Sequence, residues 1–304
     1  PPKTSGEELY LRTIAPQAHA PYITAASLWL NGTNDHHGGH ERGETIFKNF
    51  KVAVPWDYAL QARGHHNTEK LGDNTKVWLE KHVLGINHFW PKRPKSTLKL
   101  DAEGVPEYSI KPASPEKIKE VKTYYSLKNP VSFSRAWRDT QAVEKKGVWS
   151  AKLPVLNVDD YVFSYANVRY ENDIVVSSEF EAAIPSAIGN AVATDDLTKR
   201  DDVTSRWSEV APVEGVGGIQ GFRPMNNHRG TKNEMLTDPK YQAPKGSDLK
   251  LKFYCTQPQP LRLNAGQHEM ELNITASDEW QEKLIPASQM MNKKHNFALR
   301  DWSE

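Results

Sequence analysis

The stretch SLWLNGTNDHHGGHERGE, residues 27–44, runs an apolar segment directly into one aspartate and three histidines. The apolar run AASLWLNG (25–32) ends at Asn-Gly, a pattern typical of a parallel strand covered on both faces. The segments that follow predict an irregular helix over 40–54, a second strand over 55–62 and an amphipathic helix over 68–85. This order of strand, helix, strand and helix predicts two parallel strands of an α/β sheet.

Two local signals mark where helices begin or end. Ser5 followed three residues later by Glu8 is a capping-box pattern, and it predicts a short helix that Pro16 closes. Gly85 marks the predicted end of the amphipathic helix, because glycine readily adopts the backbone conformation that follows a helix.

Polar side chains follow both predicted parallel strands at their carboxyl ends. Asp35 lies just beyond the first strand, and His65 and His66 lie just beyond the second, in QARGHHNTE (61–69). Residues past the carboxyl ends of adjacent parallel strands converge on one crevice, so Asp35 and one histidine are expected to meet. A carboxylate that orients an imidazole and stabilises its cation is half of a nucleophile-activating triad.

These segments also carry a family resemblance. APYITAASLWLNGTNDHHG (20–38), WDYALQARGHHNT (56–68) and VLG (83–85) resemble the last third of the α/β-hydrolase fold. The resemblance is nearest to the dienelactone-hydrolase, acetyl-xylan-esterase and prolyl-oligopeptidase-like branch, and it covers roughly residues 8–90. It implies serine-type ester hydrolysis, with Asp35 as the triad acid and His66 as the base. His65 is the fallback for the base.

The chain departs from this family pattern at the nucleophile. No G-x-S-x-G motif occurs in its 304 residues, and two parallel strands stand where the fold needs about eight. A two-stranded sheet is not independently stable in water. The chain is therefore expected to be the carboxyl-terminal part of an enzyme whose serine and oxyanion hole come from an upstream segment or a partner chain that completes the sheet.

Further polar residues surround the predicted pair. His36, His37 and Arg63 are candidate substrate-binding residues, although a solvated arginine is the alternative for Arg63. A competing hypothesis is a zinc-dependent hydrolase, since His36, His37 and His40 lie near Asp35 and the His65–His66 pair. The two glycines in HHGGH argue against a rigid set of ligands, so no metal and no cofactor are expected.

The hydrophobic pattern of the sequence changes after residue 92, where alternating and β-branched segments replace the helical period. Residues 93–186 predict an immunoglobulin-like β-sandwich, and residues 187–304 predict a linker followed by a jelly-roll-like sandwich. The expected fold class is therefore α/β plus all-β, with a partial α/β-hydrolase sheet over 1–92 followed by the two sandwich units.

YYSLKNPVSFSRAWRD (124–139) and YVFSYANVRY (161–170) resemble the β-sandwich appended to bacterial esterase-like members of the same superfamily, and DPKYQAPKGSDLKLKF (238–253) is similar to their sugar-binding-like end domain. This similarity implies a polysaccharide partner. As aromatic residues of the last unit, Trp207, Trp280 and Trp302 are candidates for stacking on a glycan, with a place in the sandwich core as the alternative. A non-catalytic carbohydrate-binding or surface-assembly protein with a degenerate hydrolase sheet is therefore the second hypothesis.

Composition limits the partners and the compartment. The 39 Lys and Arg residues against 38 Asp and Glu give a formal charge of +1, which offers no electrostatic reason to expect nucleic acid. The lone Cys255 excludes an internal disulfide. No apolar run is long enough for a membrane-spanning helix, and PPKTSGEELY does not resemble a signal peptide. The family resemblance implies an extracellular or periplasmic location.

Overall fold

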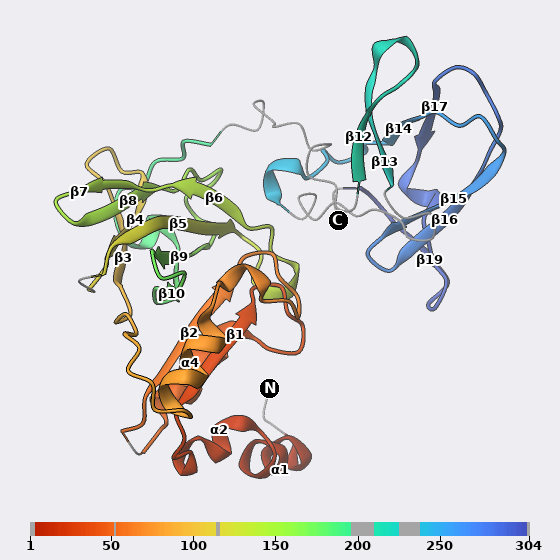
Figure 1. Cartoon of the computed structure of the whole chain (residues 1–304). Coiled ribbons are helices and arrows are strands. Elements are labelled where there is room, and N and C mark those ends of the chain that lie inside the picture. The colour runs from red at the N-terminus through yellow and green to blue at the C-terminus, as the bar shows by residue number, and fades with distance from the viewer. Residues whose placement is uncertain (1–3, 52, 114–115, 196–209, 225–237, 303–304) are drawn as a thin grey trace. The chain divides into compact units, whose positions relative to one another are not determined.

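The computed structural model describes residues 4–51, 53–113, 116–195, 210–224 and 238–302 (Figure 1). The chain divides into two compact units, residues 1–196 and 197–304. The expected divisions 1–92 and 93–186 both fall within the first unit. The range 187–304, expected to hold a linker and a sandwich, includes residues 196–209 and 225–237, which lie outside the described residues.

The first unit begins with three short helices: α1 (Ser5–Thr13), α2 (Pro16–His19) and the 3₁₀ helix η1 (Ala20–Tyr22). The capping box of α1 is formed by Thr4 and Glu7, so the prediction of Ser5 and Glu8 was wrong by one residue. Thr4 Oγ1 accepts from the Glu7 backbone N–H at 3.2 Å, and the Thr4 N–H donates to the Glu7 carboxylate at 2.6 Å. Both pairs have the required spacing, and Thr4 and Glu7 are the pair that exchanges the reciprocal hydrogen bonds.

The predicted parallel pair is confirmed. Strand β1 (Ser27–Gly32) pairs in parallel with β2 (Trp56–Gln61), and helix α3 (His40–Lys48) connects them. Ser27 lies opposite Trp56 and Gly32 opposite Gln61, so the two strands end at the same level. The register therefore delivers the segments after both strands to one edge of the sheet.

The single helix predicted over 68–85 is wrong in its first part, because two helices occupy this range. A 3₁₀ helix, η2 (Glu69–Leu71), precedes helix α4 (Asn74–His82). Between them Gly72 has φ +65° and forms a bridge with Ile174 of the sandwich. A Cβ atom at Gly72 would lie 2.0 Å from the Asp173 carbonyl oxygen, so this contact requires glycine and interrupts the helix.

The remainder of the first unit is a β-sandwich. One sheet has the order β10-β9-β5-β6, with β11 also paired to β9, and the other has the order β3-β4-β8-β7. Side chains from both sheets, including Tyr108, Ile110, Tyr125 and Val168, pack into one buried cluster between them. The strands are β3 (Lys95–Leu100), β4 (Pro106–Lys111), β5 (Ile118–Leu127), β6 (Arg138–Gln141), β7 (Val143–Lys145), β8 (Val148–Lys152), β9 (Val162–Tyr170), β10 (Val175–Ser177) and β11 (Glu181–Ala183), with 3₁₀ helices η3 (Ser132–Ser134) and η4 (Pro185–Ala187).

The sandwich covers one strand of the parallel pair. The Leu60 N–H of β2 donates to Ser177 Oγ at 2.8 Å, and Asn167 Nδ2 donates to the Leu60 carbonyl at 2.8 Å. Residues 57–61 of β2 are buried as a result, whereas residues 27–30 of β1 are only half-buried. A β-rich fold with a sandwich and a parallel pair is thus observed, while the α/β-hydrolase and immunoglobulin-like assignments stay predictions.

The second unit is built from short antiparallel strands. Two of its sheets are the pairs β12-β13 and β14-β17, and the third has the order β15-β16-β18-β19. The elements are β12 (Val210–Glu214), η6 (Val216–Gly218), β13 (Gln220–Pro224), η8 (Pro239–Tyr241), β14 (Leu249–Phe253), β15 (Gln259–Ala265), β16 (His268–Ile274), β17 (Gln281–Ile285), η9 (Ala287–Gln289), β18 (Met291–Asn292) and β19 (Phe297–Ala298). The jelly-roll assignment stays a prediction.

Two of the three tryptophans expected to stack on a glycan, Trp280 and Trp302, hydrogen-bond to backbone carbonyls of this unit. Trp280 Nε1 donates to the Val216 carbonyl at 2.9 Å, and Trp302 Nε1 donates to the Ile285 carbonyl at 2.8 Å. Trp207 lies outside the described residues. In the part of the chain that the structure covers, no helix has the length and apolar character needed to cross a membrane.

Candidate active site

The loops after β1 and β2 are held together by their backbones. The Thr33 N–H donates to the Gln61 carbonyl at 3.0 Å, and the Asn34 N–H donates to the Gly64 carbonyl at 2.9 Å. Gly32 permits this approach, because a Cβ atom there would lie 2.1 Å from the Gly64 carbonyl oxygen. The two loops therefore share one fixed geometry at the carboxyl edge of the sheet.

A buried asparagine fastens the first loop to the sandwich. Asn34 Nδ2 donates to the carbonyls of Phe133 at 3.1 Å and Arg135 at 2.8 Å, and its Oδ1 accepts from Thr33 Oγ1 at 3.0 Å. The sequence does not indicate a positioning role for Asn34, because its partners lie about a hundred residues away in the chain. Its place directly before the candidate acid is the local feature that points to it.

Asp35 and His66 meet at this edge. His66 Nδ1 lies 3.1 Å from Asp35 Oδ2, and the His37 backbone N–H donates to Asp35 Oδ1 at 2.8 Å. The Asp35 side chain is 11% exposed and the His66 ring is 57% exposed. His65 points elsewhere, with its Nδ1 2.8 Å from the Asn34 carbonyl oxygen. The expected proximity of Asp35 and His66 is confirmed, and their catalytic role stays a prediction.

The surroundings of Asp35 favour its ionised form. Partial burial pushes the pKa of this carboxyl upward, but the hydrogen bonds from the His37 backbone and the His66 ring outweigh burial, so the pKa is lowered. An ionised Asp35 accepts a hydrogen bond from Nδ1–H of His66, so Nε2 of that ring is left as the free nitrogen.

The three histidines of the opening stretch separate into two environments. The rings of His36 and His37 lie next to His66, with centroid distances of 5.3 Å and 5.2 Å to that ring. His40, by contrast, is buried between Trp137 and Phe180. The grouping of His36, His37 and His40 considered from sequence is therefore not formed, because His40 begins helix α3 and turns into an aromatic core.

Arg63 connects the second loop to the sandwich. Its backbone has φ +59°, and its N–H donates to Thr33 Oγ1 at 2.9 Å. Its guanidinium donates to the Trp137 carbonyl at 2.8 Å and to Asp139 at 2.6 Å. These contacts give Arg63 a positioning role in the loop, and its predicted contact with substrate stays a prediction.

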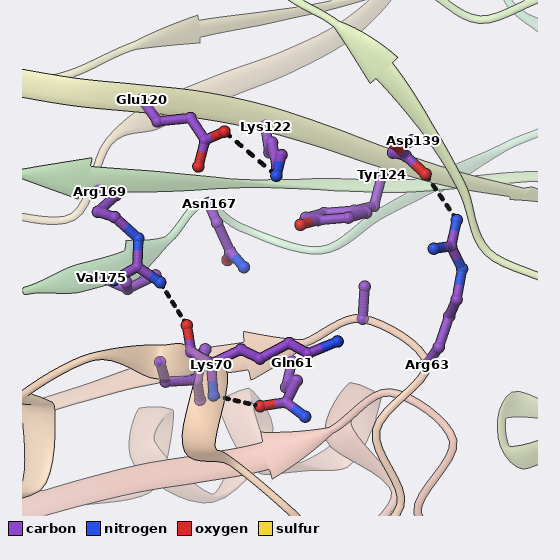
Figure 2. A pocket seen from close by; sticks show the side chains of 12 residues that line it. Gln61, Arg63, Lys70, Glu120, Lys122, Tyr124, Asp139, Asn167, Arg169 and Val175 are labelled. Carbon is purple, nitrogen blue, oxygen red and sulfur yellow. Dashed lines mark hydrogen bonds and ion pairs between the residues drawn. The ribbon is translucent and has the colours of Figure 1, made fainter. Parts of the chain in front are cut away.

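A polar pocket of about 410 Å³ opens beside the second loop, between the end of β2 and the sheet that contains β5 and β9 (Figure 2). Figure 2 shows Lys70 and the ring of Tyr124 extending into it. Its other charged residues are largely paired with each other or with neighbours, such as Lys122 with Glu120 at 3.2 Å. The lining comprises Gln61, Ala62, Arg63, Lys70, Leu71, Glu120, Lys122, Tyr124, Asp139, Asn167, Arg169 and Val175.

Comparisons with known proteins give limited information. No protein-family model matches the chain, and no curated protein matches it. Among solved structures, a bromine derivative of BhCBM56 is 11% identical with a TM-score of 0.25, over 32% of this chain and 96% of that chain. Wild-type OgpA from Akkermansia muciniphila is 12% identical with a TM-score of 0.23, over 60% of this chain and 70% of that chain. TM-scores this low do not establish a shared fold, so function is argued from the geometry of the site.

Proposed function

We propose that this chain supplies the acid and the base of a serine-type ester hydrolase, with His66 as the base and Asp35 as the residue that orients it. The observation that carries the proposal is the 3.1 Å contact between His66 Nδ1 and Asp35 Oδ2 at the shared edge of β1 and β2. The nucleophilic serine comes from an upstream segment or a partner chain, since residues 1–304 contain no G-x-S-x-G motif.

The reaction follows from the nitrogen that Asp35 leaves free. Nε2 of His66 takes the proton of the serine hydroxyl while its oxygen attacks the ester carbonyl, and the ionised Asp35 stabilises the resulting imidazolium. His66 then gives this proton to the departing alkoxide, which leaves an acyl-serine. Water attacks the acyl-serine with His66 again acting as base, and the acid and free serine are released.

The outer edge of β1 supports a sheet completed by further strands. In the described part of the chain β1 pairs only with β2, and Leu28, Trp29 and Leu30 are half-buried rather than buried. An unpaired strand edge that carries apolar residues is a ready template for another strand. We infer that the segment with the serine pairs along this edge and covers these side chains.

Serine-directed labelling tests the division of the site between segments. Residues 1–304 are expressed with and without the coding region that precedes them, and both products are treated with a fluorophosphonate and assayed on an activated acetate ester. Residues 1–304 alone are expected to show neither labelling nor turnover, and the longer product is expected to show both. Labelling of residues 1–304 alone would place the nucleophile within this chain.

Carbohydrate binding without catalysis is the second candidate function, and the polar pocket favours it. Tyr124 stacks on Tyr165 with ring centroids 5.2 Å apart, and burial together with Asp139 raises the pKa of Tyr124 to about 12. Its hydroxyl therefore stays protonated and can donate to a sugar oxygen. An aromatic ring beside Lys70 and Asn167 suits a polar, hydroxyl-rich ligand.

A binding experiment distinguishes the two candidate functions, ester hydrolysis and carbohydrate binding. If binding is the function, residues 1–304 retain polysaccharide in affinity electrophoresis, Tyr124→Ala loses this retention, and the longer product shows no esterase activity. If Tyr124→Ala retains polysaccharide as well as the unsubstituted chain does, the pocket is not the carbohydrate-binding site. Esterase activity that depends on Asp35 and His66 would instead support the hydrolase.

A further inference from the structure

Three exposed imidazoles converge beside the Asp35–His66 pair. His36, His37 and His66 each offer a ring nitrogen, and these nitrogens all lie within 4.8 Å of one another. The rings of His36 and His37 are 3.9 Å apart between centroids, and that of His37 is nearly parallel to that of His66, with an interplanar angle of 19°. Imidazole nitrogen is a preferred ligand of Zn²⁺ and of neighbouring divalent transition metals.

The spacing is close to what one ion requires. Two nitrogens that bind a tetrahedral Zn²⁺ at about 2.1 Å lie about 3.4 Å apart. The nitrogens lie within 4.8 Å of one another, so each separation exceeds this value by at most about 1.4 Å, and rotation of the exposed side chains covers that difference. His40 is not suited to join because it is buried in an aromatic cluster. Among the described residues, His65 does not belong to the group whose ring nitrogens lie within 4.8 Å of one another.

Asp35 prepares the His66 ring for a metal ion. Its carboxylate oxygen lies 3.1 Å from Nδ1, so the ring is oriented and Nε2 is left as the nitrogen that can bind. Metal-binding histidines usually donate their second ring N–H to such a carboxylate, which fixes the tautomer and raises the basicity of the ligand. The negative charge of Asp35 also favours a cation nearby.

Although the sequence alone predicts no metal, we propose that His36, His37 and His66 form a binding site for a divalent transition-metal ion such as Zn²⁺, and that the bound ion withdraws His66 from proton transfer. The binding site stands on the geometry alone, whereas its inhibitory effect rests on the proposed hydrolase function. The ion occupies Nε2 of His66, the nitrogen that would take the serine proton. Metal binding is thus a means of switching the hydrolase off rather than the source of its nucleophile.

The binding test uses residues 1–304 and Zn²⁺ in competition with a chromophoric chelator. The unsubstituted chain is expected to bind one ion. The variants His36→Gln, His37→Gln and His66→Gln are each expected to weaken binding by about tenfold or more, because loss of an outer-shell partner alone costs about 10–100-fold. Asp35→Asn is expected to weaken binding within that same range of about 10–100-fold. His295→Gln removes an exposed histidine of the second unit and is the matched control, with unchanged affinity.

X-ray absorption at the zinc edge of the unsubstituted chain provides a readout that needs no variant. The proposal predicts three imidazole nitrogens at about 2.0–2.1 Å. One imidazole ligand only, or equal affinity in all variants and the control, would overturn the site. If zinc binds as predicted but ester hydrolysis by the longer product is unchanged, the inhibitory effect is refuted, while the metal site is still supported. Absence of esterase activity would count against the hydrolase and leave the metal result independent of it.

Discussion

At the scale of single residues, histidines only three positions apart in the sequence have opposite environments. His37 is exposed beside Asp35 and His66, whereas His40 is buried against Trp137 and Phe180. Burial, together with the charge of Arg135, lowers the pKa of His40 to about 3. In the described residues Nε2 of His40 has no hydrogen-bond partner, so the ring is held neutral in the folded protein.

This buried ring predicts a loss of stability in acid. Between pH 6.5, the ordinary value for histidine, and about 3, the unfolded chain binds a proton at His40 that the folded chain does not bind. The free energy of unfolding therefore falls as the pH is lowered through this window, by up to about 1.4 kcal/mol per pH unit from this one group.

Urea unfolding across this pH window measures the effect. His40→Leu, which replaces the imidazole by an apolar side chain of similar size, is expected to flatten the dependence of the unfolding free energy on pH. His295→Gln should keep the slope of the unsubstituted chain, because His295 is exposed. A His40→Leu curve parallel to that of the unsubstituted chain would show that His40 titrates normally in the folded state.

At the scale of elements, the site depends on the close approach of the two strand ends. A side chain at Gly32 would place Cβ within 2.3 Å of backbone atoms of both Gly64 and His65. Gly32→Ala is therefore expected to push the loop of Asp35 away from the loop of His66 and to lower the melting temperature of the first unit. Backbone atoms on both sides leave no flexible side chain to absorb the clash.

Gly43→Ala is the matched control for this substitution. Gly43 lies in helix α3, and a Cβ atom there would meet the Trp29 ring at 3.5 Å, an ordinary contact. Alanine is also the better helix former, so this variant is expected to be as stable as the unsubstituted chain or slightly more stable. Equal melting temperatures for Gly32→Ala and Gly43→Ala, measured by circular dichroism, would contradict the close approach.

The elements also show what the sequence predicts and what it does not. Apolar runs and their end signals are local, so the parallel pair β1 and β2 and the meeting of Asp35 with His66 follow from the sequence. The break at Gly72 does not, because it is caused by a bridge to Ile174 a hundred residues later. The same applies to Asn34 and to the pocket, since their partners belong to the sandwich.

At the scale of the whole first unit, one buried side chain of helix α4 binds the helix to the edge of the sandwich. Asn74 Nδ2 donates to the Val175 carbonyl at 2.7 Å, and its Oδ1 accepts from the Val175 N–H at 2.8 Å. The amide thus satisfies both polar groups of one residue on the edge of strand β10. Asn74 is fully buried, so water does not replace these bonds.

Removal of this amide is expected to destabilise the entire unit. Asn74→Ala leaves the Val175 N–H and carbonyl buried without a partner, at a cost of about 1–3 kcal/mol for each group. Thermal unfolding should show a lower melting temperature in one transition, since the parallel pair is itself hydrogen-bonded to the sandwich through Leu60 of β2. Lys76→Ala, an exposed change on the same helix, should leave the melting temperature nearly unchanged. A separate early transition in Asn74→Ala would show that the two parts fold independently.

The most direct test of the proposed function is the rate of ester hydrolysis by the longer product that includes the serine segment. Replacement of the triad acid by asparagine lowers kcat by about 10⁴ in enzymes that use a Ser-His-Asp triad. Asp35→Asn and His66→Gln are expected to lower kcat on an activated acetate ester by this order, while His295→Gln leaves it unchanged. Unaltered kcat in Asp35→Asn and His66→Gln, or a loss confined to His65→Gln, would contradict the assignment of Asp35 and His66.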